Sequence, residues 1–156
     1  MQLLQLWNRR TLTYSKRFAC QSGSTRATPA GVGSPSEELR QRLKRFAIRV
    51  VKFVRALPRE PAVDVIGRQL VRSGTGVSSN YRAACRGRSR AEFIAKLGVV
   101  LEEADEAEHW LDVLDGSGLS GSDELRWLHA ESAELRAIFA ASVATARRNH
   151  RIAPKL

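Results

Sequence analysis

The sequence predicts an all-α protein: an up-down-up-down antiparallel four-helix bundle with a disordered N-terminal tail. Apolar residues recur at spacings of three and four in four successive segments, which is the period of an amphipathic helix. Short connections separate these segments, and short connections favour antiparallel neighbours. No segment alternates apolar and polar residues as a half-buried strand would. At 156 residues the chain suits one domain, for which we expect a disordered basic tail over 1–33, the bundle over 34–150 and a disordered C-terminus over 151–156.

The N-terminal tail differs in composition from the rest of the chain. Residues 1–36 hold five basic residues and no acidic one, so half of the net charge of +10 lies there. The stretch is rich in Gly, Ser, Thr and Pro from residue 21 onward and predicts disorder. Such a composition is typical of an organellar transit peptide, but translation from an upstream start in a GC-rich bacterial genome would look the same. We favour the bacterial interpretation, and we expect a cytoplasmic protein without a membrane partner because no apolar run is long enough to span a bilayer.

The first helix has a clear beginning and end in the sequence. Residues 34–37, Ser-Pro-Ser-Glu, combine a capping serine, a proline at the first helical position and a glutamate three residues after the cap. Its apolar face runs from Leu39 to Leu57, where Pro58 prevents continuation.

The second helix begins at Pro61 and keeps one apolar face to Ala84. Gly74 and Gly76 lie inside it, and their cost of about 1 kcal/mol each relative to Ala indicates a close approach to another helix. Two polar residues share the apolar face, and we expect buried hydrogen bonds from them that fix the helix register: Ser73 and Asn80.

The third and fourth helices are also predicted from local boundary residues and helical spacing. Residues 89–92, Ser-Arg-Ala-Glu, form a second capping box, and the helical pattern continues to about Asp115. The glycine- and serine-rich linker 116–121 then separates a fourth helix, which fades near Arg147.

Several segments carry a family resemblance. In order they are 67–73 (GRQLVRS), 77–82 (VSSNYR), 89–93 (SRAEF), Lys96-Leu97, 101–106 (LEEADE) and Trp110-Leu111. They resemble the bacterial four helix bundle protein family, which includes proteins encoded by intervening sequences in 23S rRNA genes, and the resemblance covers about Phe46 to Leu114. It implies a cytoplasmic bundle that forms a ring-like homopentamer and has no enzymatic activity. The related accessory protein of diversity-generating retroelements binds nucleic acid and a reverse transcriptase. Where the family commonly has an acidic residue, this chain reads Ala-Cys-Arg-Gly over 84–87, so a role for that carboxylate is in doubt.

Charge is divided along the chain. Residues 39–96 hold fifteen basic and three acidic residues, whereas residues 97–135 hold one basic and eleven acidic residues. Because the second and third helices reverse direction near Gly87, positions whose numbers sum to about 175 should lie side by side. This predicts interhelical ion pairs of Arg72 with Glu103 and of Arg68 with Glu106. For the acidic cluster of Glu102, Glu103, Asp105 and Glu106, the alternatives are an acidic docking face or a metal site.

The best candidate for a functional site is the basic turn between the second and third helices. Its members are Arg82, Arg86, Arg88, Arg90 and Lys96. Such side chains project from a helix end and can neutralise phosphates. The competing interpretation is a solvated end whose cations balance the dipole of the second helix.

Metal, cofactor and catalytic sites are not expected. Glu106 and His109 have the Glu-x-x-His spacing of di-iron bundles, but such sites need a second copy, and the position three residues before His129 is Arg126. Cys20 and Cys85 stand alone, without the spacing of a zinc site or a disulfide framework.

These features favour a non-enzymatic, homo-oligomeric bundle, expected as a pentamer, that binds RNA or DNA electrostatically. Such a bundle could serve as an accessory factor for a nucleic-acid-processing protein. The alternative is a protein-interaction scaffold that uses complementary charged faces without nucleic acid.

Overall fold

The computed structural model describes residues 35–152. The chain divides into two compact units, residues 1–39 and 40–156. Of the first unit only the beginning of one helix, residues 35–39, is described, so the predicted tail and the capping Ser34 lie outside the described residues. Everything below concerns the second unit unless a range says otherwise.

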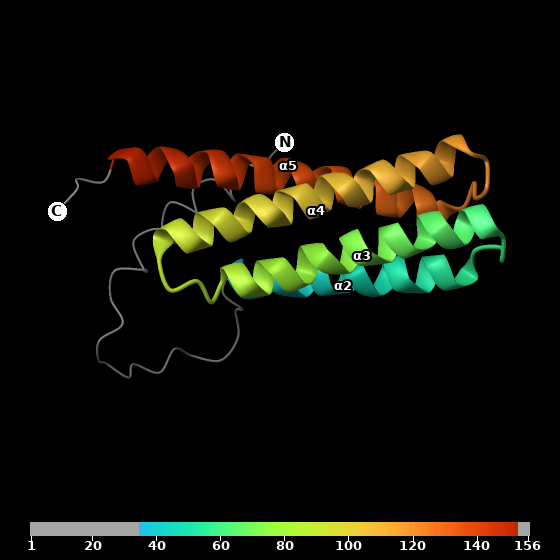
Figure 1. The fold of residues 1–156 in the computed structure, drawn as a ribbon, viewed down its shortest axis with the longest axis horizontal. Helices are drawn as coiled ribbons and strands as arrows, with labels where there is room; N and C mark the ends of the chain where they lie inside the picture. The colour runs from blue at the N-terminus through green and yellow to red at the C-terminus, as the bar shows by residue number, and fades with distance from the viewer. Residues whose placement is uncertain (1–34, 153–156) are drawn as a thin grey trace. The chain divides into compact units, whose positions relative to one another are not determined.

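Within the described range the chain is all-α and holds four helices without a strand, as predicted (Figure 1). The helices are α2 (Pro35–Ala56), α3 (Pro61–Ala84), α4 (Arg90–Gly116) and α5 (Asp123–Ile152). Helix α5 continues past the predicted fading point near Arg147. Of the expected disordered C-terminus, residues 151 and 152 are therefore helical, and 153–156 lie outside the described residues. No helix in this part of the chain is both long and apolar enough to cross a membrane.

Local side chains fix the helix beginnings. The Ser89 hydroxyl accepts a hydrogen bond from the Glu92 N–H at 3.1 Å, which caps α4. The Glu92 carboxylate reaches back to the Arg88 N–H at 2.8 Å, one residue earlier than in a standard capping box. Helix α5 is capped in the same way, because the Leu125 N–H donates to the Ser122 hydroxyl at 3.2 Å.

Contacts between the helices run antiparallel around the bundle. The pairs are Val50–Gly74 and Val54–Gly67 for α2 and α3, Arg72–Glu106 and Asn80–Glu103 for α3 and α4, Glu108–Arg136 and Asp112–His129 for α4 and α5, and Arg42–Glu131 and Arg49–Glu124 for α5 and α2. In each set the numbers rise on one helix as they fall on the other. Each helix therefore has two antiparallel neighbours, and α2 lies diagonally opposite α4.

All four helices contribute to one apolar core. The largest fully buried side chains are Leu43, Phe46, Val50, Leu70, Val77, Val100, Leu111, Leu114, Leu125, Leu128, Leu135 and Phe139. The Tyr81 and Phe139 rings pack with their centroids 5.7 Å apart. Gly74 allows the predicted close approach, because a Cβ there would be 3.1 Å from both Cγ atoms of Val50 on α2.

The two polar residues on the apolar face of α3 behave differently. Ser73 is fully buried, but its hydroxyl donates to the Gln69 carbonyl of the same helix at 3.0 Å. The expectation that Ser73 fixes the register between helices is therefore wrong, since a bond within α3 carries no such information. Asn80 is only partly buried, and its Nδ2 lies 3.5 Å from Glu103 Oε1 on α4.

Candidate nucleic-acid interface

The turn between α3 and α4 is held by its own backbone. The N–H groups of Cys85, Arg86 and Gly87 donate to carbonyls in the last turn of α3 at 3.0–3.1 Å. Gly87 is buried, and a Cβ there would be 3.2 Å from both the Ala84 oxygen and the Phe93 nitrogen. The turn thus folds back against the first turn of α4, and no arginine side chain is needed to cap α3.

The basic side chains of this turn lack acidic partners, with one exception. Arg82, Arg86 and Arg88 are exposed and Arg90 is partly buried. None of these four side chains makes an ion pair or hydrogen bond with a described residue. The exception is Lys96, whose Nζ lies 3.7 Å from Glu92. Four of the five predicted site residues therefore present guanidinium groups to solvent.

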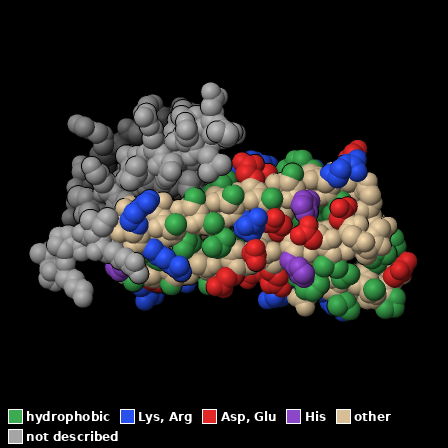
Figure 2. Space-filling model, turned by 90° about the horizontal axis from the view of Figure 1, so that it is seen from above, with side chains coloured by type: hydrophobic (Ala, Val, Ile, Leu, Met, Phe, Trp, Pro, Cys, Tyr) green, Lys and Arg blue, Asp and Glu red, His purple; other side chains and the backbone are tan. Residues whose placement is uncertain are grey.

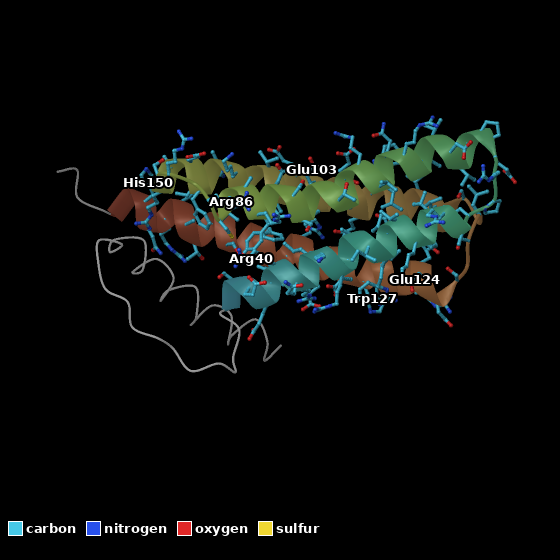
Figure 3. All side chains as sticks on the ribbon, turned by 90° about the horizontal axis from the view of Figure 1, so that it is seen from below. Arg40, Arg86, Glu103, Glu124, Trp127 and His150 are labelled. Carbon is cyan, nitrogen blue, oxygen red and sulfur yellow. The ribbon has the colours of Figure 1, made fainter. Side chains whose placement is uncertain are left out.

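Helix α5 adds two cations to the same end of the bundle. The contacts of Glu108 with Arg136 and of Asp112 with His129 set the α4–α5 register, which places Arg147 and Arg148 level with the stretch around Lys96. Both arginines are exposed, and residues 140–150 contain no carboxylate. Figure 3 shows labelled residues of the turn and of the end of α5, Arg86 and His150, at one end of the bundle.

Carboxylates gather elsewhere. On the face seen in Figure 2, acidic side chains gather over the middle of the bundle, where basic ones also lie, whereas the charged side chains visible near the end with the turn are basic. Across residues 82–96 the sequence has a single acidic residue, Glu92. We call the set Arg82, Arg86, Arg88, Arg90, Lys96, Arg147 and Arg148 the basic end.

The predicted ion pairs between α3 and α4 need correction. Arg72 Nη2 binds both carboxylate oxygens of Glu106, at 2.6 and 2.8 Å, and makes no ion pair with Glu103. Arg68 is exposed and has no ion pair within residues 35–152. The numbers of contacting positions on α3 and α4 sum to 178–183, not 175, so α4 is shifted along α3 by about one turn or more from the expected register.

Glu103 instead lies between α3 and α4 beside small residues. Its Oε2 is buried without a hydrogen-bond partner among the described residues. Burial raises the pKa of its carboxyl group, and the positive charge of Arg72 opposes that rise. Of the other members of the acidic cluster, Glu106 also accepts from the Trp110 indole at 3.3 Å, Asp105 lies 3.8 Å from Arg136, and Glu102 is exposed.

A metal centre has no support in the described part of the chain. No three His, Cys, Asp or Glu side chains in residues 35–152 lie together so as to hold a metal ion. Glu106 of the Glu-x-x-His spacing is engaged by Arg72, and His109 is exposed beside Trp110.

Ion pairs between the basic and acidic halves of the chain lie mainly between α2 and α5, and the sequence analysis did not predict these pairs. Arg42 binds Glu131 at 2.6 and 2.9 Å and Glu134 at 2.7 Å. Arg49 makes two bonds to Glu124, at 2.7 and 2.5 Å, and its guanidinium lies 3.3 Å from the centroid of the Trp127 ring. Figure 3 shows Glu124 and Trp127 far from the turn that carries Arg86.

Comparison with known proteins identifies the family. The family model for the 23S rRNA-intervening sequence protein matches residues 37–141. The chain belongs to this family. This member of the 23S rRNA-intervening sequence protein family is similar to a solved structure, that of a protein of unknown function from the S23 ribosomal protein family of Bacteroides thetaiotaomicron. It is 29% identical, aligns with a TM-score of 0.64, and the match covers 70% of this chain and 97% of that one.

The family match bears on the basic end. It includes the whole turn between α3 and α4 but stops before Arg147 and Arg148. No curated protein matches the chain. Membership of the 23S rRNA-intervening sequence protein family thus supports the four-helix fold. The evidence for a function comes from the residues of the basic end.

Proposed function

We propose that the protein is a non-enzymatic, homo-oligomeric nucleic-acid-binding accessory protein that contacts phosphates through its basic end. The observation that carries the proposal is the set of four guanidinium groups, on Arg82, Arg86, Arg88 and Arg90, that surround the turn without a carboxylate partner in residues 35–152.

Unpaired guanidinium groups suit phosphate oxygens. A guanidinium is planar, always charged and able to donate two parallel hydrogen bonds to one phosphate. Elsewhere in the bundle arginines make such paired bonds with carboxylates, as Arg49 does with Glu124. At the turn the same donors have no acidic partner, so an anionic ligand would satisfy them.

The capping interpretation is weaker than the binding one. The last carbonyls of α3 already accept hydrogen bonds from the backbone of residues 85–87. A cation near that helix end still gains a few tenths of a kcal/mol from the dipole. That gain does not require four arginines spread over α3, the turn and α4.

Self-association, which we propose as a pentameric ring, would multiply this site. Equivalent turns from several subunits would lie on one rim and contact one nucleic acid together. Linked weak contacts can raise the overall affinity by a factor of about 10² to 10⁴ without any new contact. An assembly of this kind would serve in the cytoplasm as an accessory factor for a nucleic-acid-processing protein.

A salt titration with matched variants tests the proposal. The site variant replaces Arg86, Arg88 and Arg90 by Ala. The control variant makes the same change at Arg55, Arg59 and Arg68, which are also exposed and lie toward the opposite end of the bundle. Both lose three positive charges, and both keep the N-terminal tail.

We expect the site variant to lose affinity for mixed-sequence nucleic acid and the control to lose little. The slope of log K against log salt should fall by about 2 to 3 in the site variant, because each lost phosphate contact removes about 0.9. Equal losses in the two variants would show that net charge, not the turn, drives binding. No binding by the wild type would overturn the proposal.

The scaffold function is supported by two charged faces. The outward face of α2 carries Lys44, Arg45 and Arg55 around Ile48, which is 44% exposed. The diagonally opposite helix α4 presents Val99, 39% exposed, followed by the exposed carboxylates of Glu102 and Asp105. Opposite charges around exposed aliphatic side chains on opposite faces would suit head-to-tail association of copies.

The oligomeric mass separates the two functions. If the α2 face is used for assembly, Arg45→Glu should reduce the solution mass. Adding Glu102→Arg to the same chain should restore that mass, because the α2 and α4 faces then carry opposite charges again. If nucleic-acid binding survives in a monomeric variant, the scaffold is not required for it. If no variant of these faces changes the mass, this pairing of faces is wrong.

A further inference from the structure

We infer that the basic end takes a double-stranded nucleic acid, gripped through the phosphates of both strands, in preference to a single strand. This inference rests on the proposed function and narrows its ligand class. The observations are the burial of the aromatic residues near the basic end and the distribution of its cations over two separate parts of the bundle.

Single-strand binding sites combine positive charge with exposed aromatic rings on which bases stack, each worth about 1 to 3 kcal/mol. None of the Phe, Tyr and Trp side chains in the described residues gives the basic end such a platform, and the exposed aromatic ring at that end is the imidazole of His150. Tyr81 is 8% exposed and Phe139 is fully buried, with the two rings packed on each other. Phe93 is partly buried, and its backbone lies against Gly87.

The two tryptophans within residues 35–152 make contacts elsewhere. Trp127 lies under the guanidinium of Arg49, beside Glu124. Trp110 donates to Glu106 within the acidic stretch of α4. Both rings have carboxylates beside them, so neither offers a base a place next to a phosphate-binding cation.

The cations form two groups. Arg82, Arg86, Arg88 and Arg90 follow the α3–α4 turn, and Arg147 with Arg148 lies on α5. Packed helices are separated by about 8 to 10 Å. The grooves of duplex DNA are about 6 and 12 Å wide, so two such groups can reach phosphates on both sides of a groove.

Charge density favours the same ligand. A duplex carries one negative charge per about 1.7 Å of its axis, and a single strand about half of that. A site that relies on ion contacts without stacking therefore gains more from a duplex. Because duplex RNA and duplex DNA share the phosphate chemistry, both are possible sources, and they form separate arms of the test.

The experiment measures dissociation constants of the full chain for four probes at ~0.15 M salt: duplex RNA, duplex DNA, and one strand of each, all of ~20 nucleotides or base pairs and mixed sequence. Fluorescence anisotropy with end-labelled probes is a suitable readout. We expect at least about tenfold tighter binding of one or both duplexes than of the matching single strand.

One variant and its matched control connect the preference to the cation group on α5. Arg147→Ala with Arg148→Ala should weaken duplex binding several-fold and change single-strand binding much less. The matched control replaces Arg55 and Arg59 by Ala, and circular dichroism confirms that each variant folds. A preference for duplex RNA or for duplex DNA would show which source supplies the phosphates and would support the inference.

Failure of the duplex inference and failure of the proposed function would give different results. Single strands that bind as tightly as duplexes, or a homopolymer preference that indicates base stacking, would overturn the duplex inference and leave the proposed function standing. Equal losses of duplex and single-strand binding in the α5 variant would also overturn it. Absence of binding to all four probes would overturn the proposed function itself.

Discussion

Glu103 of α4 lies directly over Gly76 of α3, so that a Cβ atom on Gly76 would be 2.5 Å from Glu103 Oε2. The carboxylate fills the space that a larger residue at position 76 would take. Its oxygen is buried without a hydrogen-bond partner in the described range, and burial raises the pKa of the carboxyl group. The carboxylate therefore occupies this position because residue 76 has no side chain.

Two glycine substitutions on α3 should have opposite effects on stability. In Gly74→Ala the new methyl group would be 3.1 Å from the side chain of Val50, which is fully buried in the core, so overpacking should cost about 1 to 3 kcal/mol. In Gly76→Ala only the flexible end of Glu103 is in the way, so the helix-propensity gain of up to about 1 kcal/mol should dominate. Urea unfolding measures both, and a Gly76→Ala variant less stable than Gly74→Ala would contradict this account.

Removing the charge of Glu103 should stabilise the fold at neutral pH. Because the folded-state pKa is raised, the charged carboxylate is a cost above that pKa, and the cost is relieved as the pH falls through it. We expect Glu103→Gln to be more stable than the wild type at pH 7 by less than about 1 kcal/mol. The difference should disappear as the pH is lowered toward 4.5 and below. Thermal unfolding across this range measures the effect, with Glu102→Gln on the exposed side of α4 as the matched control.

Loss of the Arg42 side chain should destabilise the fold more than loss of Glu134, the more exposed of its two carboxylate partners. Arg42 bridges Glu131, whose side chain is 12% exposed, and Glu134, whose side chain is 45% exposed. Arg42→Ala leaves the Glu131 carboxylate partly buried without its partner, at an expected cost of about 1 to 3 kcal/mol. Glu134→Ala should cost only about 0.2 to 1 kcal/mol. If chemical denaturation shows equal losses of stability in the two variants, burial of the Glu131 carboxylate does not add to the cost of losing Arg42.

The cap of α4 should be needed to hold the basic turn. Ser89→Ala removes the acceptor of the Glu92 N–H and should cost about 0.5 to 2 kcal/mol. Ser79→Ala is the matched control, because that hydroxyl only bonds the Gly76 carbonyl of its own helix at 3.2 Å. Its effect should stay within about 0.5 kcal/mol. Thermal melts of the two variants measure the difference, and a harmless Ser89→Ala would show that the turn is held without this cap.

The helix boundaries were predictable because their causes are local. Pro61 begins α3 and Ser89 caps α4 through atoms at most three residues away in the chain. The same holds for the basic turn, whose cations are neighbours in sequence. Fold class and the main candidate site therefore follow from short-range patterns.

The registers between helices were not predictable to within a turn. Arg72 pairs with Glu106 and not with Glu103, and this register depends on the geometry of the turn between the helices, which spacing alone does not contain. The pair Arg42 and Glu131 is separated by 89 positions, so its alignment depends on three connections together. Arg147 and Arg148 were missed as site residues for the same reason, since their place depends on the α4–α5 register.

The length of α4 keeps the acidic stretch from opposing the basic end. From Arg90 to Glu102 the helix rises about 18 Å, and at physiological ionic strength the Debye length is about 8 Å. Phosphates at the turn would therefore hardly sense the carboxylates of the bundle middle. At about 0.01 M salt the Debye length grows to about 30 Å, and the repulsion then reaches the turn. A plot of affinity against ionic strength should accordingly flatten at its dilute end.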